Sequence, residues 1–412
     1  MSGDPNGDPE EAAAPRVLRG WDIACVGFAD WDQPLWTNQQ HLMSRLAAAN
    51  RVLFVESLGL RRPTISSRDL SRMGRRVLRA ARGARTHDGV AVLSPLVIPR
   101  HDVPAIQRAN RRLLALQVRR AARGLGFRRP LLWGYVPQAE ALLAPLAPEL
   151  VIYHCVDDIA AQRGVDGEAF QAAERRFAAR ADLVLASAPA LAERMRALNP
   201  NVLYAPNVAD TELFATALEP GPVDPALAAL PRPRIVFTGA VVATKLDLEL
   251  LAGLARSRPE WTIALVGPVG EGDPTTDVSA LAALPNVALL GGRAYGELPA
   301  VLRGADAAMI PYAINRLTAS IFPMKVNEYL AAGLPVVATP LPALAGVPDL
   351  AVAADAQAFA AELDAALAQD GPAARAERSA RAAARSWTAR IAEIDAALAP
   401  IVAGRPTTAG QP

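Results

Sequence analysis

Strand-like apolar runs alternate with helical segments along this chain, and the alternation occurs in two separate series. The first series predicts strands at 21–28, 51–56, 90–93, 130–133, 150–155, 183–186 and 202–205. After a proline-rich link at 220–234, a second series predicts strands at 235–238, 262–266, 287–290, 307–310 and 336–338. Because strands that alternate with helices form parallel sheets covered on both faces, the sequence predicts an α/β protein with two doubly wound Rossmann-like domains.

The length and composition fit this division into domains. The chain has 412 residues, 51% of them hydrophobic, with a formal net charge of +2, which indicates a globular protein with more than one core. We expect a disordered tail at 1–16, domains at 17–207 and 208–372, a helix at 373–403 and a second disordered tail at 404–412. The polar, Pro/Gly-rich start is unlike a secretory signal. Cys25 and Cys155 each fall within a predicted strand, which favours buried, reduced thiols and a cytoplasmic location.

The stretch Ser320–Pro340 predicts a helix, a tight stop and a buried strand. Pro323 suits a first helical turn, and Gly333 suits the left-handed position that ends a helix. Lys325 lies in the first turn, where a cation opposes the helix macrodipole, so its presence there indicates an anion nearby. The alternative is a surface lysine paired with Glu328, three residues further on.

Small residues follow several strands of the second series, among them Gly239 and Gly267. In open α/β sheets the ligand lies beyond the carboxyl ends of the strands, where glycine lets the backbone approach it. Lys245 lies at a loop that enters a helix, a position suited to a diphosphate, although a solvated lysine is the alternative. No G-x-G-x-x-G follows a strand and no G-x-x-x-x-G-K-[ST] occurs, which argues against a nicotinamide or flavin dehydrogenase and against a P-loop enzyme.

The segment Arg61–Arg85 is strongly basic, with nine arginines against a single acid, Asp69. Apolar residues are interleaved at roughly helical spacing, which is typical of a helix that lies on an anionic membrane surface. A solvated surface helix is the alternative. Nucleic acid is not expected as a partner, because no aromatic platform accompanies the charge.

The second half resembles the donor half of GT-B glycosyltransferases of family 4, the glycosyl transferases group 1 type. The similarity is carried by F-T-G-A-V-V-A-T-K-L-D-L-E-L-L, by L-V-G-P and by P-M-K-V-N-E-Y-L-A-A-G-L-P-V-V-A-T. It covers about 235–345 well and the first half more loosely, through W-T-N-Q-Q-H-L and R-V-L-F-V-E. The resemblance implies a cleft between two Rossmann-like domains and a C-terminal helix that crosses back. It also implies a nucleotide-diphosphate-sugar donor in the C-terminal domain, an acceptor mainly on the N-terminal domain, and no cofactor.

The resemblance also assigns roles to single residues. Lys245 matches the family's phosphate-binding lysine, and Glu328 matches the second glutamate of an E-x7-E motif, which holds the donor ribose. Gly239, Gly267 and Lys325 belong to the same expected donor site. The first glutamate of the motif falls on Ser320, and the arginine that commonly follows the glycine is Ala240.

Further candidates lie in the first half. His154 lies near the end of the strand predicted at 150–155, and Asp157 follows that strand, at the edge expected to face the cleft. Together with Ser320, these two residues are the catalytic candidates. For His154 a core position is the alternative, and for Asp157 and its neighbour Asp158 a helix cap.

We expect an acceptor loop after the first strand, with Asp30, Trp36 and Asn38 as contacts. Asp30-Trp31-Asp32 imitates a metal-binding D-x-D, but it does not follow a nucleotide-binding half. The four histidines are scattered, so no metal site is expected.

The function expected from these features is a metal-independent glycosyltransferase acting on a glycan or lipid-linked acceptor in cell-surface polysaccharide or glycolipid synthesis. The resemblance implies retention at the anomeric carbon. We expect it in the cytoplasm, where Arg61–Arg85 would attach it peripherally to the membrane. One alternative is a sugar-nucleotide epimerase of the same fold, which an assay without acceptor would separate. The other is a non-catalytic nucleotide-sugar-binding subunit, motivated by Ser320 and Ala240.

Overall fold

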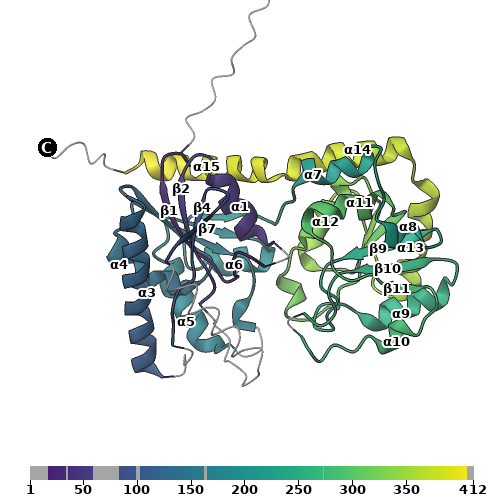
Figure 1. Cartoon of the computed structure of the whole chain (residues 1–412), viewed down its shortest axis with the longest axis horizontal. Coiled ribbons are helices and arrows are strands. Elements are labelled where there is room, and N and C mark those ends of the chain that lie inside the picture. Colours follow the sequence, from purple (N-terminus) through teal and green to yellow (C-terminus); the bar gives the residue numbers. More distant parts are fainter. Residues whose placement is uncertain are drawn as a thin grey trace, which may run out of the picture.

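The computed structural model describes residues 17–33, 36–58, 83–98, 103–161, 165–271 and 273–405. The N-terminal tail at 1–16, the end of the C-terminal tail and most of the basic segment Arg61–Arg85 lie outside these residues. The described parts form two α/β domains that lie next to each other, joined along one side by the last helices (Figure 1).

The N-terminal domain contains a mostly parallel sheet. Its strands are β1 (Asp22–Val26), β2 (Arg51–Val55), β3 (Arg85–His87), β4 (Val90–Leu93), β5 (Pro130–Gly134), β6 (Leu150–Cys155), β7 (Leu183–Ala186) and β8 (Val202–Tyr204). They are arranged in the order β3-β4-β2-β1-β5-β6-β7-β8, and only the β3–β4 pair is antiparallel. β1, β6 and β7 are buried along their whole length, as expected of central parallel strands covered on both faces.

The C-terminal domain contains a parallel sheet with the order β11-β10-β9-β12-β13-β14. Its strands are β9 (Arg234–Thr238), β10 (Thr262–Val266), β11 (Val287–Leu289), β12 (Ala307–Ile310), β13 (Val336–Ala338) and β14 (Leu350–Val352). The chain order reverses between β9 and β12, which is the topological switch point where open α/β sheets bind their ligands. The prediction of two doubly wound domains is therefore confirmed.

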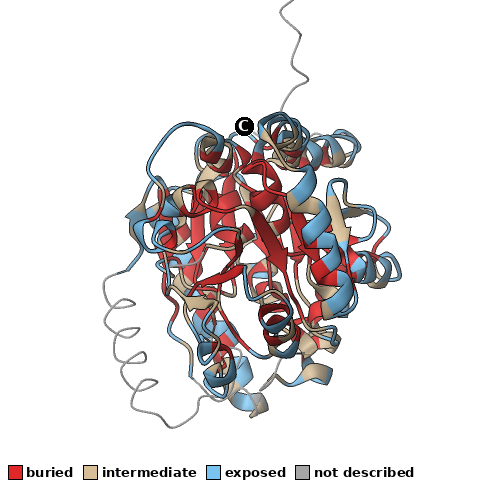
Figure 2. Cartoon of the chain, turned by 90° about the vertical axis from the view of Figure 1, so that its right-hand side faces the viewer, coloured by how far each residue is buried: buried red, intermediate tan, exposed pale blue. Residues whose placement is uncertain are grey.

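Helices cover both sheets, so that the buried strands lie inside a shell of partly exposed helices (Figure 2). In the first domain these are α1 (Asn38–Leu46), α3 (Pro104–Gly124), α4 (Leu143–Leu146), α5 (Gly167–Ala178), α6 (Pro189–Arg196) and the 3-10 helix η1 (Pro137–Leu142). In the second they are α7 (Thr211–Ala215), α8 (Pro225–Ala228), α9 (Leu248–Ser257), α10 (Ser279–Ala282), α11 (Leu298–Arg303), α12 (Met324–Ala331) and α13 (Ala356–Gln369). No helix among the described residues is both long enough and apolar enough to cross a membrane.

The prediction of a single C-terminal helix over 373–403 is wrong. The chain forms α14 (Pro372–Ala382) and α15 (Trp387–Ala403), and it breaks between them at Ser386, whose hydroxyl caps α15 by accepting from Ala389 N at 3.2 Å. The two helices pack on different domains. Ser379 of α14 donates to Ala331 O of α12 at 2.6 Å, whereas α15 packs on the N-terminal sheet.

The chain crosses between the domains at two neighbouring points. The chain leaves the N-terminal domain at Ala209 and returns to it at Ser386. These two residues form a parallel β-bridge. Ala209 N donates to Arg385 O at 3.2 Å. The connection is therefore a pair of adjacent strands rather than one linker, and α15 lies along the outer side of the first domain (Figure 1).

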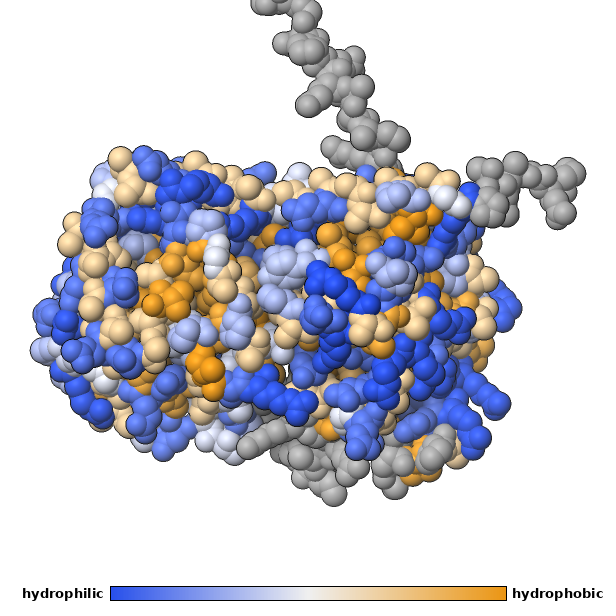
Figure 3. Space-filling view, turned by 180° about the vertical axis from the view of Figure 1, so that it is seen from behind, coloured by the Kyte–Doolittle hydropathy of each residue, from blue (hydrophilic) through white to orange (hydrophobic). Residues whose placement is uncertain are grey.

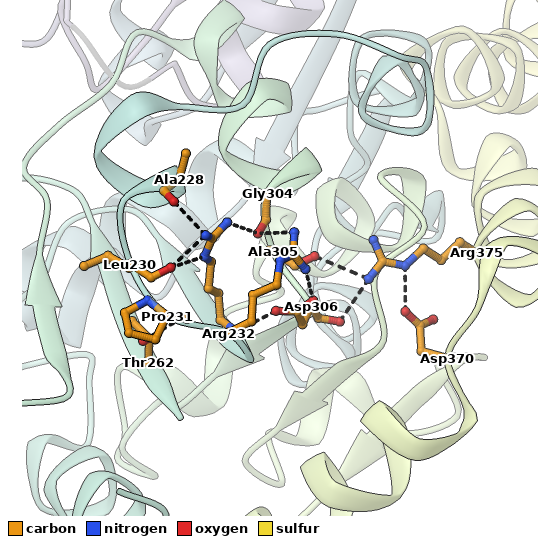
Figure 4. A network of polar contacts seen from close by, with 11 residues as sticks. Ala228, Leu230, Pro231, Arg232, Thr262, Gly304, Ala305, Asp306, Asp370 and Arg375 are labelled. Carbon is orange, nitrogen blue, oxygen red and sulfur yellow. Dashed lines mark hydrogen bonds and ion pairs between the residues drawn. The ribbon is translucent and has the colours of Figure 1, made fainter. Parts of the chain in front are cut away.

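A network of arginines and aspartates holds together the amino-terminal edge of the second sheet (Figure 4). Arg234, only 8% exposed, donates to Ala228 O, Leu230 O and Gly304 O at 2.7 to 3.3 Å. Asp306 accepts from Arg234 N at 2.7 Å and pairs with Arg232. The network thereby connects the segment after α8 to the first residues of β9 and β12.

Candidate functional site

The carboxyl ends of β9 and β10 approach each other closely through two glycines. Gly239 N donates to Val266 O at 2.8 Å, and a Cβ on Gly267 would overlap with the carbonyl of Gly239. Gly239 has φ of +129° and its Cα lies against the side chain of Lys325. Packing and backbone conformation therefore require glycine at both positions, and the prediction that glycines converge there with the start of α12 is confirmed.

The start of α12 brings Lys325 to this edge. Pro323 occupies the N-cap position, so α12 begins at Met324, and Lys325 lies in the first turn. Gly333 ends the helix with φ of +76°, as predicted. In the described part of the chain, no carboxylate lies within ion-pair distance of Lys325. A half-buried cation thus lies at the positive end of a helix without a compensating acid.

Glu328 lies one turn further along α12 and is only 5% exposed. Burial raises the pKa of its carboxyl, and the nearby charge of Lys325 opposes that rise. Within the described residues the carboxylate has neither a hydrogen-bond donor nor an ion-pair partner. The alternative of a surface Lys325–Glu328 pair is therefore wrong. A buried acid without a partner costs stability, so its retention needs a functional reason.

Lys245 lies in the turn between Gly239 and α9. Its backbone N donates to Val242 O at 3.0 Å, and its side chain is exposed. Asp247 caps α9 by accepting from Leu250 N at 2.9 Å. Over the described ranges, no acid lies within ion-pair distance of the Lys245 ammonium. Lys245 and Lys325 therefore offer two cations without protein partners.

Asp157 of the N-terminal domain interacts electrostatically with Lys245 of the C-terminal domain. Burial raises the pKa of its carboxyl to about 6, the charge of Lys245 opposes that shift, and Asp158 adds to it. Tyr312 lies among the same groups: burial raises the pKa of its phenol, Lys245 lowers it, and Glu328 and Asp157 raise it. Charged groups of both domains thus meet at the carboxyl edge of the second sheet.

The neighbouring Asp158 forms a direct ion pair across the two domains. It accepts from Arg194 of α6 at 3.3 Å, and Arg316 of the C-terminal domain lies 3.8 Å away. The sequence interpretation did not single out Arg316 or Tyr312. Tyr312 lies just past the end of β12, so the rule that selected Gly239 and Gly267 would have found it as well.

The structure places His154 inside the N-terminal core. Its ring stacks on Tyr135 with centroids 4.7 Å apart, and only 4% of the residue is exposed. Burial lowers the pKa of the imidazole to about 3, and Arg390 of α15 lowers it further. A neutral, enclosed imidazole offers no surface to a substrate, so His154 is not part of the site proposed below.

The expected acceptor loop lies between β1 and the start of α1. Trp36 is half-buried, with its ring 5.7 Å from that of Trp31. Asn38, 4% exposed, donates to Asn207 Oδ1 at 3.0 Å, and Asn207 in turn donates to Phe322 O at 2.9 Å. Asn38 therefore helps to position the crossing strand and the start of α12. Of the three residues, only Trp36 and Asp30 are accessible enough to contact an acceptor.

Ser320 belongs to a short 3-10 helix (Thr318–Ser320) that precedes α12. It is half-buried, and its hydroxyl makes no hydrogen bond to any residue that the structure describes. The two cysteines are buried and unbridged, as expected. Among the described residues, no group of three or more histidine, cysteine or acidic side chains could hold a metal ion.

Comparison with known proteins connects this site to a family. Residues 232–369 match the family model described as glycosyl transferases group 1. A protein of Bacillus subtilis (strain 168), provisionally assigned as the teichuronic acid biosynthesis glycosyltransferase TuaH, is 31% identical over 228 residues. That match covers 51% of this chain and 55% of the relative, so it spans about half the length of each.

Solved structures match over nearly the whole chain. A sucrose-phosphate synthase from Thermosynechococcus elongatus has a TM-score of 0.62 at 17% identity, covering 93% of this chain and 100% of that one. Anabaena Alr3699/HepE in complex with UDP and glucose has a TM-score of 0.61 at 16% identity, with 93% and 100% coverage. At these identities the likeness establishes the fold.

Proposed function

Because the chain belongs to the glycosyl transferases group 1 family and has its GT-B fold, we propose that it is a glycosyltransferase that uses a nucleotide-diphosphate sugar. The observation that carries the proposal is the group of charged side chains without protein partners at the carboxyl edge of the second sheet. Lys325 lies against Gly239, and Lys245 lies in the turn that precedes α9; both would bind the donor diphosphate together with the backbone N–H groups at the start of α12. Glu328 would accept hydrogen bonds from the ribose hydroxyls.

This arrangement suits the chemistry of sugar transfer. Breaking the bond between the anomeric carbon and the diphosphate leaves negative charge on the phosphate oxygens, and cations already in position stabilise that charge as it develops. Lys245 and Lys325 would supply this stabilisation without a metal ion. We propose retention at the anomeric carbon, in line with the family, and place Ser320 near the donor sugar.

Asp157 is the N-terminal group best placed to act on the acceptor. Its charge interacts with that of Lys245 of the C-terminal domain, and its pKa of about 6 lets it take a proton near neutral pH. The acceptor would lie on the N-terminal side, against Trp36 and Asp30. A hydroxyl of the acceptor could then approach both Asp157 and the sugar that leaves the diphosphate.

The relatives suggest the substrate class. One is assigned to teichuronic acid biosynthesis and another was solved with UDP and glucose, so we propose a UDP-hexose donor and a glycan or lipid-linked acceptor for a cell-surface polysaccharide. The enzyme would work in the cytoplasm at the inner face of the membrane, aided by Arg61–Arg85. A non-catalytic donor-binding subunit is the second candidate, favoured by Ser320 in place of the first motif glutamate.

Titration calorimetry with UDP and UDP-glucose tests the donor site, using the wild type and Glu328→Gln. A hydrogen bond to a charged group contributes about 1.5–3 kcal/mol, so the variant should bind UDP roughly ten- to a hundredfold more weakly. The unliganded variant should also melt at a higher temperature, because it no longer buries a charge. Wild-type affinity in Glu328→Gln would refute the ribose assignment. Binding without transfer to any acceptor preparation would favour the non-catalytic subunit.

A further inference from the structure

The outward face of α3 combines arginines with an exposed leucine. α3 carries six arginines and no acid, and it runs along the outer edge of the N-terminal domain, far from α9 and α13 of the second domain (Figure 1). We define the α3 surface as its exposed residues Arg112, Leu113, Leu116, Arg119, Arg120 and Arg123. Leu116 is 66% exposed, the highest value among the large apolar side chains of the described residues.

Helical geometry explains why these residues share one face. The buried residues Asn110, Leu114, Val118 and Ala122 recur every four positions and pack toward the sheet. At about 100° per residue, Leu116 and Arg123 lie opposite that buried stripe. Arg112 and Arg119 lie on one side of Leu116, and Leu113 and Arg120 on the other.

The arginines of the α3 surface have no acidic partners in the described chain. Arg111, which points about 140° away from Leu116 around the helix, pairs with Glu140 at 3.4 Å. The arginines at 112, 119, 120 and 123 are exposed and make no ion pair with a described residue. Their charge is therefore available to an external anion.

Apolar side chains extend this face beyond the helix. Leu96 and Ile98 follow β4 and are each 40% exposed. Leu96 N donates to Gln117 Oε1 at 2.9 Å, and Ile98 N donates to Asn110 Oδ1 at 2.8 Å. The segment 94–98 is thus fixed along α3, and its leucine and isoleucine join Leu113 and Leu116 at the surface. Figure 3 shows the molecule from behind, where apolar side chains also come to the surface between charged ones.

We propose that the α3 surface docks on a lipid bilayer that contains anionic lipids. The arginines would bind head-group phosphates, and Leu116, Leu113 and the neighbouring Leu96 would enter the apolar boundary of the bilayer. The apolar residues here are aliphatic, whereas protein-binding hot spots favour tryptophan and tyrosine, so a lipid surface fits better than an acidic protein. The inference rests on residues other than Arg61–Arg85 and does not depend on sugar transfer.

Co-sedimentation of the full chain with vesicles tests the proposal. One set of vesicles contains phosphatidylcholine alone, and the other contains about 30% phosphatidylglycerol. The wild type should bind the anionic vesicles preferentially and lose binding between about 0.05 M and about 0.5 M salt. Arg112→Glu/Arg119→Glu should bind at least tenfold more weakly, since each basic residue near such a surface adds about fivefold. Leu116→Ser should weaken binding without abolishing its salt dependence.

The matched control is Arg196→Glu/Arg256→Glu, which makes the same change in net charge at two exposed arginines on other helices. It should bind like the wild type, and melting curves of all variants should coincide. Full binding by Arg112→Glu/Arg119→Glu would place membrane contact elsewhere, such as Arg61–Arg85, and overturn the proposal. A wild-type chain that stays in the supernatant at low salt would also overturn it and leave an acidic protein as the partner of this surface.

Discussion

The two edges of the C-terminal sheet use charged residues in opposite ways. At the amino edge, Arg234 is buried and all its donors point at carbonyl oxygens, while Asp306 accepts from Arg232 and a backbone N–H (Figure 4). At the carboxyl edge, Glu328 is buried and Lys325 is half-buried, and neither makes a hydrogen bond or an ion pair with a described residue. The protein therefore satisfies the charges at one edge and leaves those at the other edge without partners among the described residues.

The difference separates charges that stabilise the fold from charges that serve function. A buried charge that finds good donors or acceptors can be retained for structure. A buried charge without a partner destabilises the protein, and selection for folding alone would remove it. Substitutions at the two edges should therefore affect different quantities, with stability lost at the amino edge and donor affinity or turnover lost at the carboxyl edge.

The largest effect is expected from Arg234→Ala. The substitution leaves Ala228 O and Leu230 O without their side-chain donor and Gly304 O with only Arg232, so the free energy of unfolding should fall by about 3 kcal/mol or more. Urea denaturation measures the loss. Arg234→Lys keeps the charge but cannot reach all three oxygens. Its free energy of unfolding should therefore lie between those of the wild type and Arg234→Ala. UDP affinity of the folded fraction should be unchanged. A loss below about 1 kcal/mol would mean that this network contributes little to the fold.

Lys245→Ala should show the reverse pattern. The side chain is exposed and has no described partner, so the free energy of unfolding should change by no more than about 0.5 kcal/mol. If Lys245 binds the leaving diphosphate, kcat/KM should fall roughly ten- to a hundredfold. Arg256→Ala, an exposed cation on α9 of the same domain, serves as control and should leave turnover intact. Normal turnover in Lys245→Ala would remove it from the donor site.

The fold was largely predictable from the sequence because its strands are continuous apolar runs. Strands such as Leu150–Cys155 and Val336–Ala338 have the predicted limits, since burial on both faces leaves no polar alternation to misread. Ser386 was missed as a break because the segments on both sides have helix-forming composition, and the break depends on the chain turning from one domain to the other. The edge strands β3 and β14 are short and only partly buried, so they carry a weak apolar signal.

The site was predictable where local geometry determines it. Gly239, Lys325 and Glu328 lie together because the strand end and the helix start are local features. The meeting of Asp157 with Lys245 joins residues of different domains, and no spacing in the sequence encodes it. For His154 the local position was misleading. A residue near the end of a strand was a candidate for the cleft, but α15 covers that face of the sheet and buries it.

The pH dependence of stability tests whether the carboxyl of Asp157, at the carboxyl edge, destabilises the fold when it is charged. Its pKa of about 6 in the folded protein exceeds the ordinary 3.8, so between these values the folded state holds a proton that the unfolded state has released. Stability should therefore fall as pH rises from about 4 to about 6, by up to about 3 kcal/mol, and this component should level off above that range. Denaturation curves at several pH values should show that Asp157→Asn removes this component.

The same carboxyl also gives a kinetic test. If Asp157 accepts a proton from the acceptor, the wild-type kcat/KM should rise through an apparent pKa near 6, and Asp157→Asn should lose that limb. Asp158→Asn is the comparison variant: it should keep this limb but move it to lower pH, because the charge of Asp158 raises the pKa of Asp157. A pH profile unchanged in Asp157→Asn would show that the carboxyl contributes to interdomain charge only.

The smallest effect is expected from Ser320→Ala. Its hydroxyl makes no hydrogen bond to the described residues, so folding should be unaffected, and one neutral hydrogen bond to the donor sugar contributes only about 0.5–1.5 kcal/mol. We therefore expect kcat/KM to fall by about two- to tenfold, with UDP affinity unchanged because the nucleotide contacts lie elsewhere. Steady-state kinetics beside calorimetry separate the two quantities. A loss as large as that of Lys245→Ala would mean that this serine has taken over the role of the family's first glutamate. No loss at all would place the sugar away from the 3-10 helix, so that only the nucleotide half of the proposed site would remain.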